Sequence, residues 1–582
     1  MGTRRWAFAA GLALAGGCYS GSSAGPTADA DDGAEEGGGS DDGTADGDAG
    51  SDDGVPAGCE DAAPPRAALQ RMGQRQYVNA LEALFGVPTI DAVRTAVDAL
   101  PATKIGLFSS EVPPASYAEV AAYLDIASRL ALVLTADDAG LTALRPCLTE
   151  VAPGADAATD ACLSEYIGEL GPRILRRPLT DEDTARLAED YAVGGEHNVN
   201  EGVATLLIAL LIDPEFLYLV ETRGEELEEG VVVLTPHETA AKLARVVWNS
   251  VPDEELLAVA DAGLDDTQLA EQLGRMLDDE RARGAMAEFY RDWLHLGGLP
   301  FPSEALFPDP DERAELRDAM AEELVDFAAA TTLDREGTYS DLLLDREASI
   351  ESDVLADLYG VSTGSDVMLP EGERAGILTR AGFLATIEIR GSNAGHLIKR
   401  GHRLSSMLCR PLPLPDPANF PQDDPADPAS NPDSGIRERF NAATTEAVCA
   451  ACHVQLDSLG APLGHYGSSG EWIDEETIEL SPGDTVALPL NTVSEVAFDG
   501  EAIEITDGLA FSAAMAESRI AAGCFAQQLT RNIVARPLEP GDACMVAFAS
   551  DALAPQEGEP QSIREAIVRL VMSEHFRRNS VQ

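Results

Sequence analysis

A short motif of cysteine and histidine carries the strongest chemical signal in the chain. Residues 449–453 read Cys-Ala-Ala-Cys-His, the C-x-x-C-H pattern of a c-type haem attachment site. Two thiols three residues apart lie on one helical turn, where they can bond to the two vinyl groups of a haem. The adjacent imidazole would reach the iron as its proximal ligand. The motif predicts haem c, with iron as its metal, on Cys449, Cys452 and His453.

Two other interpretations of the motif remain open. The two cysteines could form an ordinary disulfide or stay free. They could also bind zinc together with Cys409 and one histidine. The candidate histidines are His396, His402 and His453. The zinc interpretation is weaker, because no second compact pair of ligands is present and an exported chain favours oxidised thiols.

The segment after the motif supplies candidates for orienting His453. Residues 461–464 read Ala-Pro-Leu-Gly and are similar to the Pro-Leu segment of small cytochromes c, in which the proline carbonyl accepts the N–H of the proximal imidazole. By that similarity Pro462 would fix the ring of His453. A proline before Leu-Gly also suits an ordinary turn.

Met515 and His465 are the main candidates for the sixth iron ligand, and His396 and His402 are further ones. The thioether of Met515 would raise the reduction potential, whereas His465 would give a bis-histidine iron of lower potential. We expect low-spin iron with His453 and one of these two. An open position is the alternative, and a haem enzyme would require it.

The elements that must position these residues are mainly helices. Apolar residues recur at helical spacing, with capping signals such as Thr180 before three acids and Thr235-Pro236 before a glutamate. The predicted helices cover residues 71–85, 117–134, from 181, 203–212, from 236, 266–296, 311–331 and 349–359. Residues 473–506 alternate polar and apolar side chains between turn signals, which predicts two to four short antiparallel strands. The fold class is therefore mainly α, with a small β insertion after the haem-type segment.

The first residues predict export and a lipid anchor. Residues 1–18 contain a short basic region, an apolar run too short to span a membrane, and small residues ending at Cys18. This pattern resembles a bacterial lipoprotein signal, in which Cys18 is lipidated; the alternative is a plain signal peptide. Residues 19–65 are rich in glycine, serine and acids and read as a disordered tether. We expect a protein anchored to the outer or cytoplasmic membrane that faces the periplasm or the cell surface.

The charge of the chain limits its partners. The formal net charge is −61, so a nucleic acid or an anionic membrane surface is a poor partner. The few basic spots include residues 176–178 and 399–401, whose arginines could hold haem propionates or form structural ion pairs. We favour the structural interpretation. No hydrolase, metalloprotease or nucleotide-binding motif stands in a convincing context.

Six further cysteines fit disulfides in an oxidising compartment. Cys147 and Cys162 flank a short loop, and we expect them to pair. Cys524 and Cys544 flank a helix and a turn and are expected to form a second local bridge. Cys59 and Cys409 are left over, and we expect them to pair with each other.

Several blocks, in this order, resemble the exported multi-block proteins of the planctomycete cytochrome c type. The matching stretches are residues 71–86, Arg173 to Thr180, Asp213 to Tyr218, Leu243 to Trp248, Pro252 to Leu256, Trp293-Leu294, Arg374 to Leu378, residues 399–401 and Cys524 to Arg536. The resemblance implies an exported helical protein and no particular reaction. After the motif the family continues D-P-x-G-x-x-x-E, but here Ser458 replaces the proline and the glutamate is missing. The role of those residues therefore does not carry over.

The expected organisation has seven parts. These are a lipoprotein-type signal (1–18), a tether (19–65), an N-terminal helical block (66–135), a block with a local disulfide (136–195), a central helical block (196–335), a haem-type block (336–475) and a β insertion with a C-terminal helical block (476–582). The expected function is electron transfer or service as a redox partner. The alternatives are a surface binding or scaffold protein in which the haem is auxiliary or absent, and a haem-dependent oxidoreductase.

Overall fold

The computed structural model describes residues 59, 64–66, 69–98, 100, 115–221, 223–228, 230–386, 394–412, 433–445, 447–481, 484–554 and 561–580. The predicted signal with Cys18 and almost all of the predicted tether lie outside these residues. Within them, the prediction of a mainly α fold is confirmed, and the strands form only small sheets. None of the described helices is long and apolar enough to cross a membrane.

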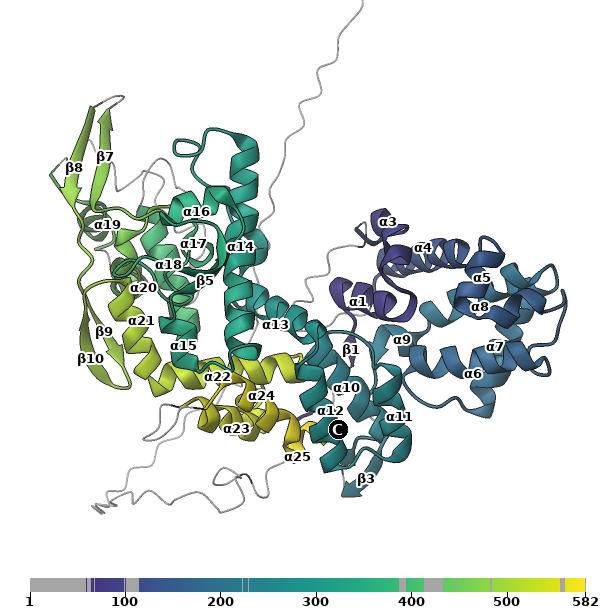
Figure 1. The fold of residues 1–582 in the computed structure, drawn as a ribbon. Helices are drawn as coiled ribbons and strands as arrows, with labels where there is room; N and C mark the ends of the chain where they lie inside the picture. The colour runs from purple at the N-terminus through teal and green to yellow at the C-terminus, as the bar shows by residue number, and fades with distance from the viewer. Residues whose placement is uncertain are drawn as a thin grey trace, which may run out of the picture. The chain divides into compact units, whose positions relative to one another are not determined.

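The first group of helices surrounds its own hydrophobic core (Figure 1). Its members are α1 (Gln74–Phe85), α2 (Val87–Asp91), α3 (Arg94–Asp98), α4 (Tyr117–Leu134), α5 (Asp138–Leu144), η1 (Pro146–Glu150), α6 (Ala161–Leu175), α7 (Asp181–Gly195), α8 (Val199–Leu211) and α9 (Pro214–Leu217). The cap predicted for α7 is present, because Thr180 and Asp183 satisfy each other's backbone amides. Helix α8 is buried or half-buried from Gly202 to Leu211, as its apolar sequence predicts, whereas Ile212, expected in the same buried run, is exposed.

The second core is built by the remaining helices. Its central members are α10 (Pro236–Trp248), α11 (Glu254–Ala262), α12 (Asp266–Leu277), α13 (Glu280–Trp293), η2 (Leu296–Gly298), α14 (Pro310–Leu333), α15 (Tyr339–Leu344), α16 (Asp353–Tyr359) and α17 (Ala381–Leu384). The single helix predicted at 266–296 is instead two, because Asp279 caps a new helix. The helix predicted at 349–359 is shorter, because its first residues end the strand β5 (Glu347–Ile350).

The C-terminal members of the second core carry the motif. They are α18 (Ala394–Met407), α19 (Ile436–Ala443), α20 (Ala447–Gly460), η5 (Ala461–His465), α21 (Gly508–Glu517), α22 (Arg519–Val534), η6 (Pro540–Asp542), α23 (Ala543–Leu553), α24 (Ile563–Met572) and α25 (Glu574–Arg577). Between η5 and α21 lie two antiparallel hairpins, β7 (Glu475–Ser481) with β8 (Asp484–Pro489) and β9 (Ser494–Phe498) with β10 (Glu501–Ile505). These hairpins confirm the predicted β insertion.

The remaining strands are short and join distant parts of the chain. They are β1 (Gln70–Arg71), β2 (Tyr218–Leu219), β3 (Glu225–Glu228), β4 (Val231–Val233), β6 (Gly364–Met368) and β11 (Arg578–Ser580). Strand β1 pairs with β2, and β5 pairs with β6. Strand β4 lies between β3 and β11. The last described residues of the chain therefore add the third strand to a sheet whose other two strands lie in the central block.

All six cysteines predicted in disulfides are paired, but only one predicted pair is correct. Cys147 pairs with Cys162, with Cα atoms 6.0 Å apart. The predicted pairs Cys524–Cys544 and Cys59–Cys409 are wrong. The structure pairs Cys59 with Cys544 and Cys409 with Cys524.

The exchange of partners has a clear structural origin. The segment around residues 64–66 runs beside residues 536–541, where the Arg536 guanidinium donates to the carbonyl of Arg66. This places Cys59 beside the start of α23 and its Cys544. Helix α22, which carries Cys524, packs against α18. Cys409 lies just after the end of α18, within reach of Cys524. Proximity in the sequence therefore did not determine the pairing.

Helices α18 and α20 pack in close contact through two glycines. A Cβ on Gly401 would lie 2.1 Å from the carbonyl oxygen of Leu456. A Cβ on Gly460 would lie 1.9 Å from the carbonyl oxygen of Leu397. The two contacts show that the helices run antiparallel, and that neither position has room for a side chain.

We predict that Gly401→Ala destabilises the protein. Overpacking costs about 1–3 kcal/mol, whereas the alanine returns only about 0.5–1 kcal/mol through its helix propensity. The readout is the midpoint of chemical denaturation. The matched control is Gly274→Ala in α12, where a new Cβ meets no atom within 4 Å and stability should rise. An equal rise in both variants would contradict the proposed close crossing.

Candidate functional site

The C-x-x-C-H motif forms the first turns of α20, as its haem interpretation requires. Cys452 and His453 are both half-buried and adjacent on the helix. Cys452 is the only free cysteine among the described thiols, whereas the side chain of Cys449 is outside the described part. The thiol of Cys452 and the imidazole of His453 therefore lie on the same turn of α20.

His453 is placed to be neutral at physiological pH. Partial burial lowers its pKa below the ordinary value, and the carboxylate of Asp457 opposes this shift. Neutral imidazole is the form that binds a metal ion. Asp457 lies four residues after His453, one helical turn further along α20.

Asp457 is itself held by Arg437 from the neighbouring helix α19. The Nε of Arg437 donates to the Asp457 carboxylate over 2.9 Å. The same guanidinium donates to the carbonyl of Val493 and the hydroxyl of Ser494. One arginine thus ties together α19, α20 and the start of β9. Sequence reasoning missed this pair, although an acid four residues after the histidine was a usable signal.

Arg400 fixes the segment that follows α20. Its side chain is fully buried and donates to the carbonyls of Leu384, Leu463, Tyr466 and Gly467. Burial lowers its pKa to about 9, and the carbonyl bonds offset part of the cost of burying the charge. Arg400 is therefore a structural residue, as expected, because these carbonyls occupy its donors.

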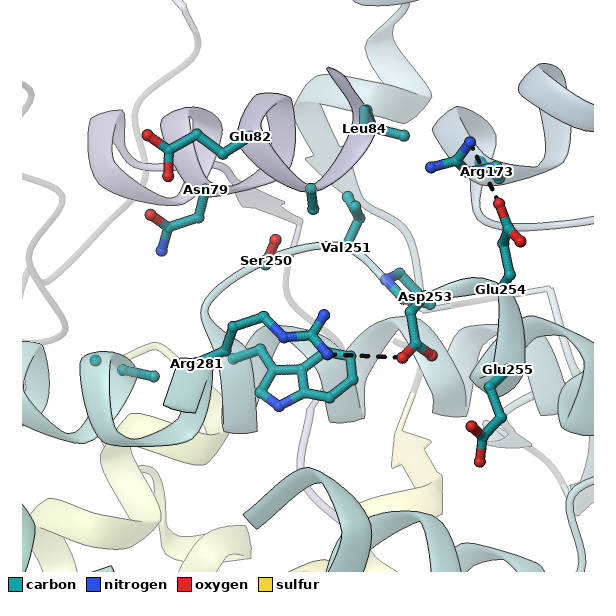
Figure 2. A pocket seen from close by; sticks show the side chains of 15 residues that line it. Asn79, Glu82, Leu84, Arg173, Ser250, Val251, Asp253, Glu254, Glu255 and Arg281 are labelled. Atoms are coloured by element: carbon teal, nitrogen blue, oxygen red, sulfur yellow. Dashed lines mark ion pairs between the residues drawn. The ribbon is translucent and has the colours of Figure 1, made fainter. Parts of the chain in front are cut away.

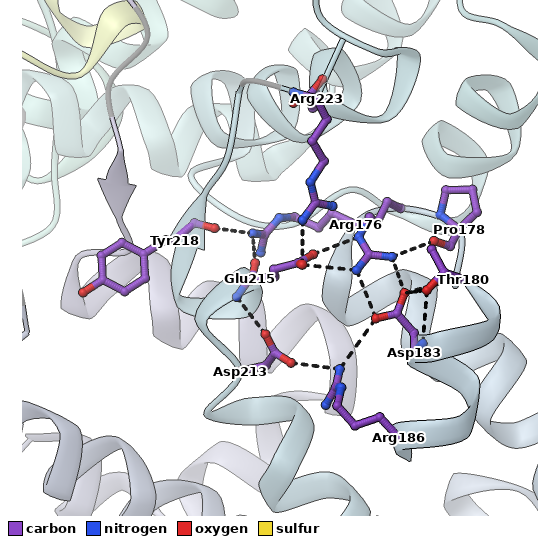
Figure 3. A network of polar contacts seen from close by, with 11 residues as sticks. Arg176, Pro178, Thr180, Asp183, Arg186, Asp213, Glu215, Tyr218 and Arg223 are labelled. Atoms are coloured by element: carbon purple, nitrogen blue, oxygen red, sulfur yellow. Dashed lines mark hydrogen bonds and ion pairs between the residues drawn. The ribbon is translucent and has the colours of Figure 1, made fainter. Parts of the chain in front are cut away.

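The arginines at residues 176 and 177 are also structural (Figure 3). Arg176 donates to the carbonyls of Phe216 and Tyr218, over 3.0 and 2.8 Å. Arg177 forms ion pairs with Asp183 at 2.6 Å and Glu215 at 2.8 Å. The network joins α6 and α7 to α9.

The structure places the three secondary candidates in different settings. Pro462 is buried in η5, directly after α20. His465 ends the same turn, where its Nδ1 lies 3.1 Å from the carbonyl oxygen of Ile473 and its ring stacks on Trp472 at 4.7 Å. Met515 is completely buried in α21, which packs on α15 and η5. Of the two candidate ligands, His465 lies in the short helix that directly continues from α20, whereas Met515 lies on a later helix that packs on η5.

The zinc interpretation loses a ligand. Cys409 is bonded to Cys524, and a disulfide sulfur is not the thiolate that zinc requires. The described side chains, which do not include that of Cys449, contain no group of three or more histidine, cysteine, aspartate or glutamate residues that could hold a metal ion. The donor set that remains, two cysteines and a histidine on one helix, fits covalent haem.

Three segments of the chain match domain families. Residues 162–221 match PSD5, protein of unknown function (DUF1595), and residues 234–361 match PSD4, protein of unknown function (DUF1592). Residues 374–476 match PSCyt3, protein of unknown function (DUF1588), and this match includes the motif. The three matches overlap the stretches on which the resemblance to the planctomycete cytochrome c type rests. Their descriptions assign no reaction. No curated protein and no solved structure matches the chain.

A buried glutamate, Glu476, bonds to the first residue of α19. Glu476, the second residue of β7, is buried, and both of its carboxylate oxygens accept from the amide of Ile436, at 2.8 and 3.1 Å. Burial raises the pKa of Glu476 from 4.5 to about 7. The folded protein thus holds a proton on Glu476 that the unfolded chain releases between these values.

We predict that Glu476 makes the protein less stable as the pH rises from about 4.5 to 7. The folded state binds more protons in this window, so the free energy of unfolding falls. Glu476→Gln should remove this decrease, so the variant should gain stability relative to the wild type as the pH rises. The measurement is denaturation at several pH values, with the exposed Glu475→Gln as control. A difference that does not change with pH would refute the assignment.

Proposed function

We propose that the protein carries one covalent haem c on Cys449 and Cys452, with His453 as the proximal ligand, and that it transfers electrons to or from a partner protein. The observation that carries the proposal is the C-x-x-C-H motif at the start of α20, inside the segment that matches PSCyt3. A haem bound there supplies one-electron redox chemistry. We further propose that lipidation of Cys18 anchors the exported chain to a membrane.

The disulfides support the assignment of the motif. Six cysteines are oxidised in three pairs, which suits an exported protein. The thiol of Cys452 makes no disulfide, which leaves it available for haem attachment.

The residues around His453 would hold its imidazole in a fixed setting. Partial burial keeps the ring neutral, so its lone pair is available to a metal. Asp457, fixed by Arg437, adds a negative charge one turn away and favours a more electron-rich imidazole. Pro462 would accept the second N–H of the ring, as in small cytochromes c.

We propose His465 as the sixth ligand in preference to Met515. A carbonyl only accepts hydrogen bonds, so the contact with Ile473 places the proton of His465 on Nδ1 and leaves the lone pair on Nε2. This arrangement is typical of metal-binding histidines, whose other nitrogen donates to a carbonyl. Met515 instead has the complete burial of a core side chain.

The attachment is tested by expressing the chain in a host that matures c-type cytochromes. We predict that a denaturing gel stained for haem shows a band for the wild type and none for Cys449→Ser/Cys452→Ser. Cys147→Ser/Cys162→Ser is the matched control, since it also removes two cysteines, and it should keep the stain. An unstained wild-type band would contradict the proposal and favour the alternative function, a binding protein without haem.

The sixth ligand is tested by absorption spectroscopy of the haem protein. We predict that His465→Gln converts a low-spin ferric spectrum to a high-spin one, because the iron loses a strong ligand. Met515→Leu, which keeps the side-chain volume, should leave the spectrum unchanged. His237→Gln, on α10 and paired with Asp261, is the histidine control. Loss of a sulfur-to-iron charge-transfer band in Met515→Leu would reverse the assignment.

A further inference from the structure

A cavity of about 740 Å³ lies among the helices that precede the motif (Figure 2). Its walls come from α1, α6, the turn between α10 and α11, and α13, and none of its lining residues belongs to α18, α20 or η5. The haem assignment leaves this cavity without a role. Its size is in the range of sites for small molecules.

One wall contains a buried hydroxyl group without a partner. Asn249 ends α10 in the left-handed conformation, with φ of 49°, and the chain then turns into Ser250. Ser250 lines the cavity and is only 4% exposed, and its Oγ makes no hydrogen bond to the described residues. Leaving a buried hydroxyl without a hydrogen bond is unfavourable, because the group has lost its water and gained no partner. A polar ligand would remove this cost.

The wall formed by α13 presents a fixed positive charge. The guanidinium of Arg281 stacks on the ring of Trp248 at 3.3 Å and is held by Asp279 at 2.8 Å. A looser contact of 3.7 Å joins it to Asp253. Its Nη1 makes no hydrogen bond within the described part of the chain and remains available to a ligand. Stacking on an indole orients a guanidinium without consuming its donors.

The opposite wall, on α1, presents acceptors. Glu82 forms only a loose contact with Arg94, at 3.8 Å. The Nδ2 of Asn79 donates to the carbonyl of Asn249, so its Oδ1 is directed elsewhere and can accept. Figure 2 shows Asn79 and Glu82 on α1, across the cavity from Arg281.

We infer that this cavity binds a short zwitterionic peptide. The carboxylate of the peptide would pair with Arg281, and its ammonium group with Glu82 and the Oδ1 of Asn79. Ser250 would bond to the peptide backbone, and apolar side chains such as Leu84 and Val251 would cover its side chains. The lining carries both charges, with the carboxylates of Glu82, Asp253, Glu254 and Glu255 and the guanidiniums of Arg173 and Arg281, so a ligand with both charges is favoured over a purely anionic or purely cationic one. The cavity is larger than a single amino acid needs, which favours a peptide.

The test measures binding by titration calorimetry of the full chain with three probes. Triglycine carries both charges, N-acetyl-triglycine lacks the ammonium group, and triglycine amide lacks the carboxylate. Each lost charge removes a charge-assisted hydrogen bond, so both capped peptides should bind on the order of tenfold more weakly. Equal binding of all three, or no binding of triglycine, would overturn the inference.

Two variants locate the binding. Gly284 in α13 lines the cavity, and a Cβ there meets no atom within 4 Å, so Gly284→Phe should fill the space and abolish binding. Gly274→Phe in α12, where a Cβ is equally unobstructed, should leave binding intact. Glu82→Gln should remove the preference for triglycine over its acetylated form. Unchanged binding in both Gly284→Phe and Glu82→Gln would refute the site, whatever the result for haem.

Discussion

The close crossing of α18 and α20 is the constraint on which the candidate haem site depends. At Gly401 and Gly460 the backbone of each helix touches the other, so the position of the motif relative to α18 is fixed by the main chain. Flexible side chains at the same points would allow the helices to slide. The fully buried Arg400 adds to this constraint, because it lies beside Gly401 and bonds to the carbonyls that follow α20. Glycine and arginine thus act together: the glycines allow the two backbones to touch, and the arginine satisfies buried carbonyls of the segment that follows α20.

Buried arginines have the same role elsewhere in this acidic protein. Arg374 is 1% exposed and donates to the carbonyls of Thr379 and Gly470, and its guanidinium lies over the ring of Tyr359 at 4.5 Å. Arg176 binds the carbonyls of Glu215 and Phe216 in α9 and that of Tyr218 directly after it. Each guanidinium has five donors in a fixed plane, so it can hold several loop carbonyls that would otherwise be buried without partners. The chain has an excess of acids overall, yet it buries arginines where loops must be fixed.

Features that depend on residues close together in the chain could be predicted from the sequence. The cap at Thr180, the bridge between Cys147 and Cys162 and the two hairpins after η5 all follow local rules, and all were predicted. The motif, likewise, is read from five consecutive residues. Local rules also explain the error at 266–296, where the periodic apolar pattern masked the cap at Asp279.

Features that depend on distant contacts could not be predicted in this way. The partners of Cys59 and Cys524 depend on how the segment before β1 and the end of α18 meet the last helices. The pairing of Arg437 with Asp457 requires α19 to fold back on α20, which no periodicity encodes. The cavity between α1 and α13 joins residues far apart in the chain, so its composition is invisible in the sequence.

The central claim is that Cys449 and Cys452 exist to bind haem covalently. The most direct measurement is the intact mass of the denatured protein after expression with c-type maturation, compared with the same chain expressed without it. The account predicts a difference of one haem per chain, located by peptide mapping to residues 449–453. An unchanged mass, with Cys449 and Cys452 found in a disulfide with each other, would contradict it.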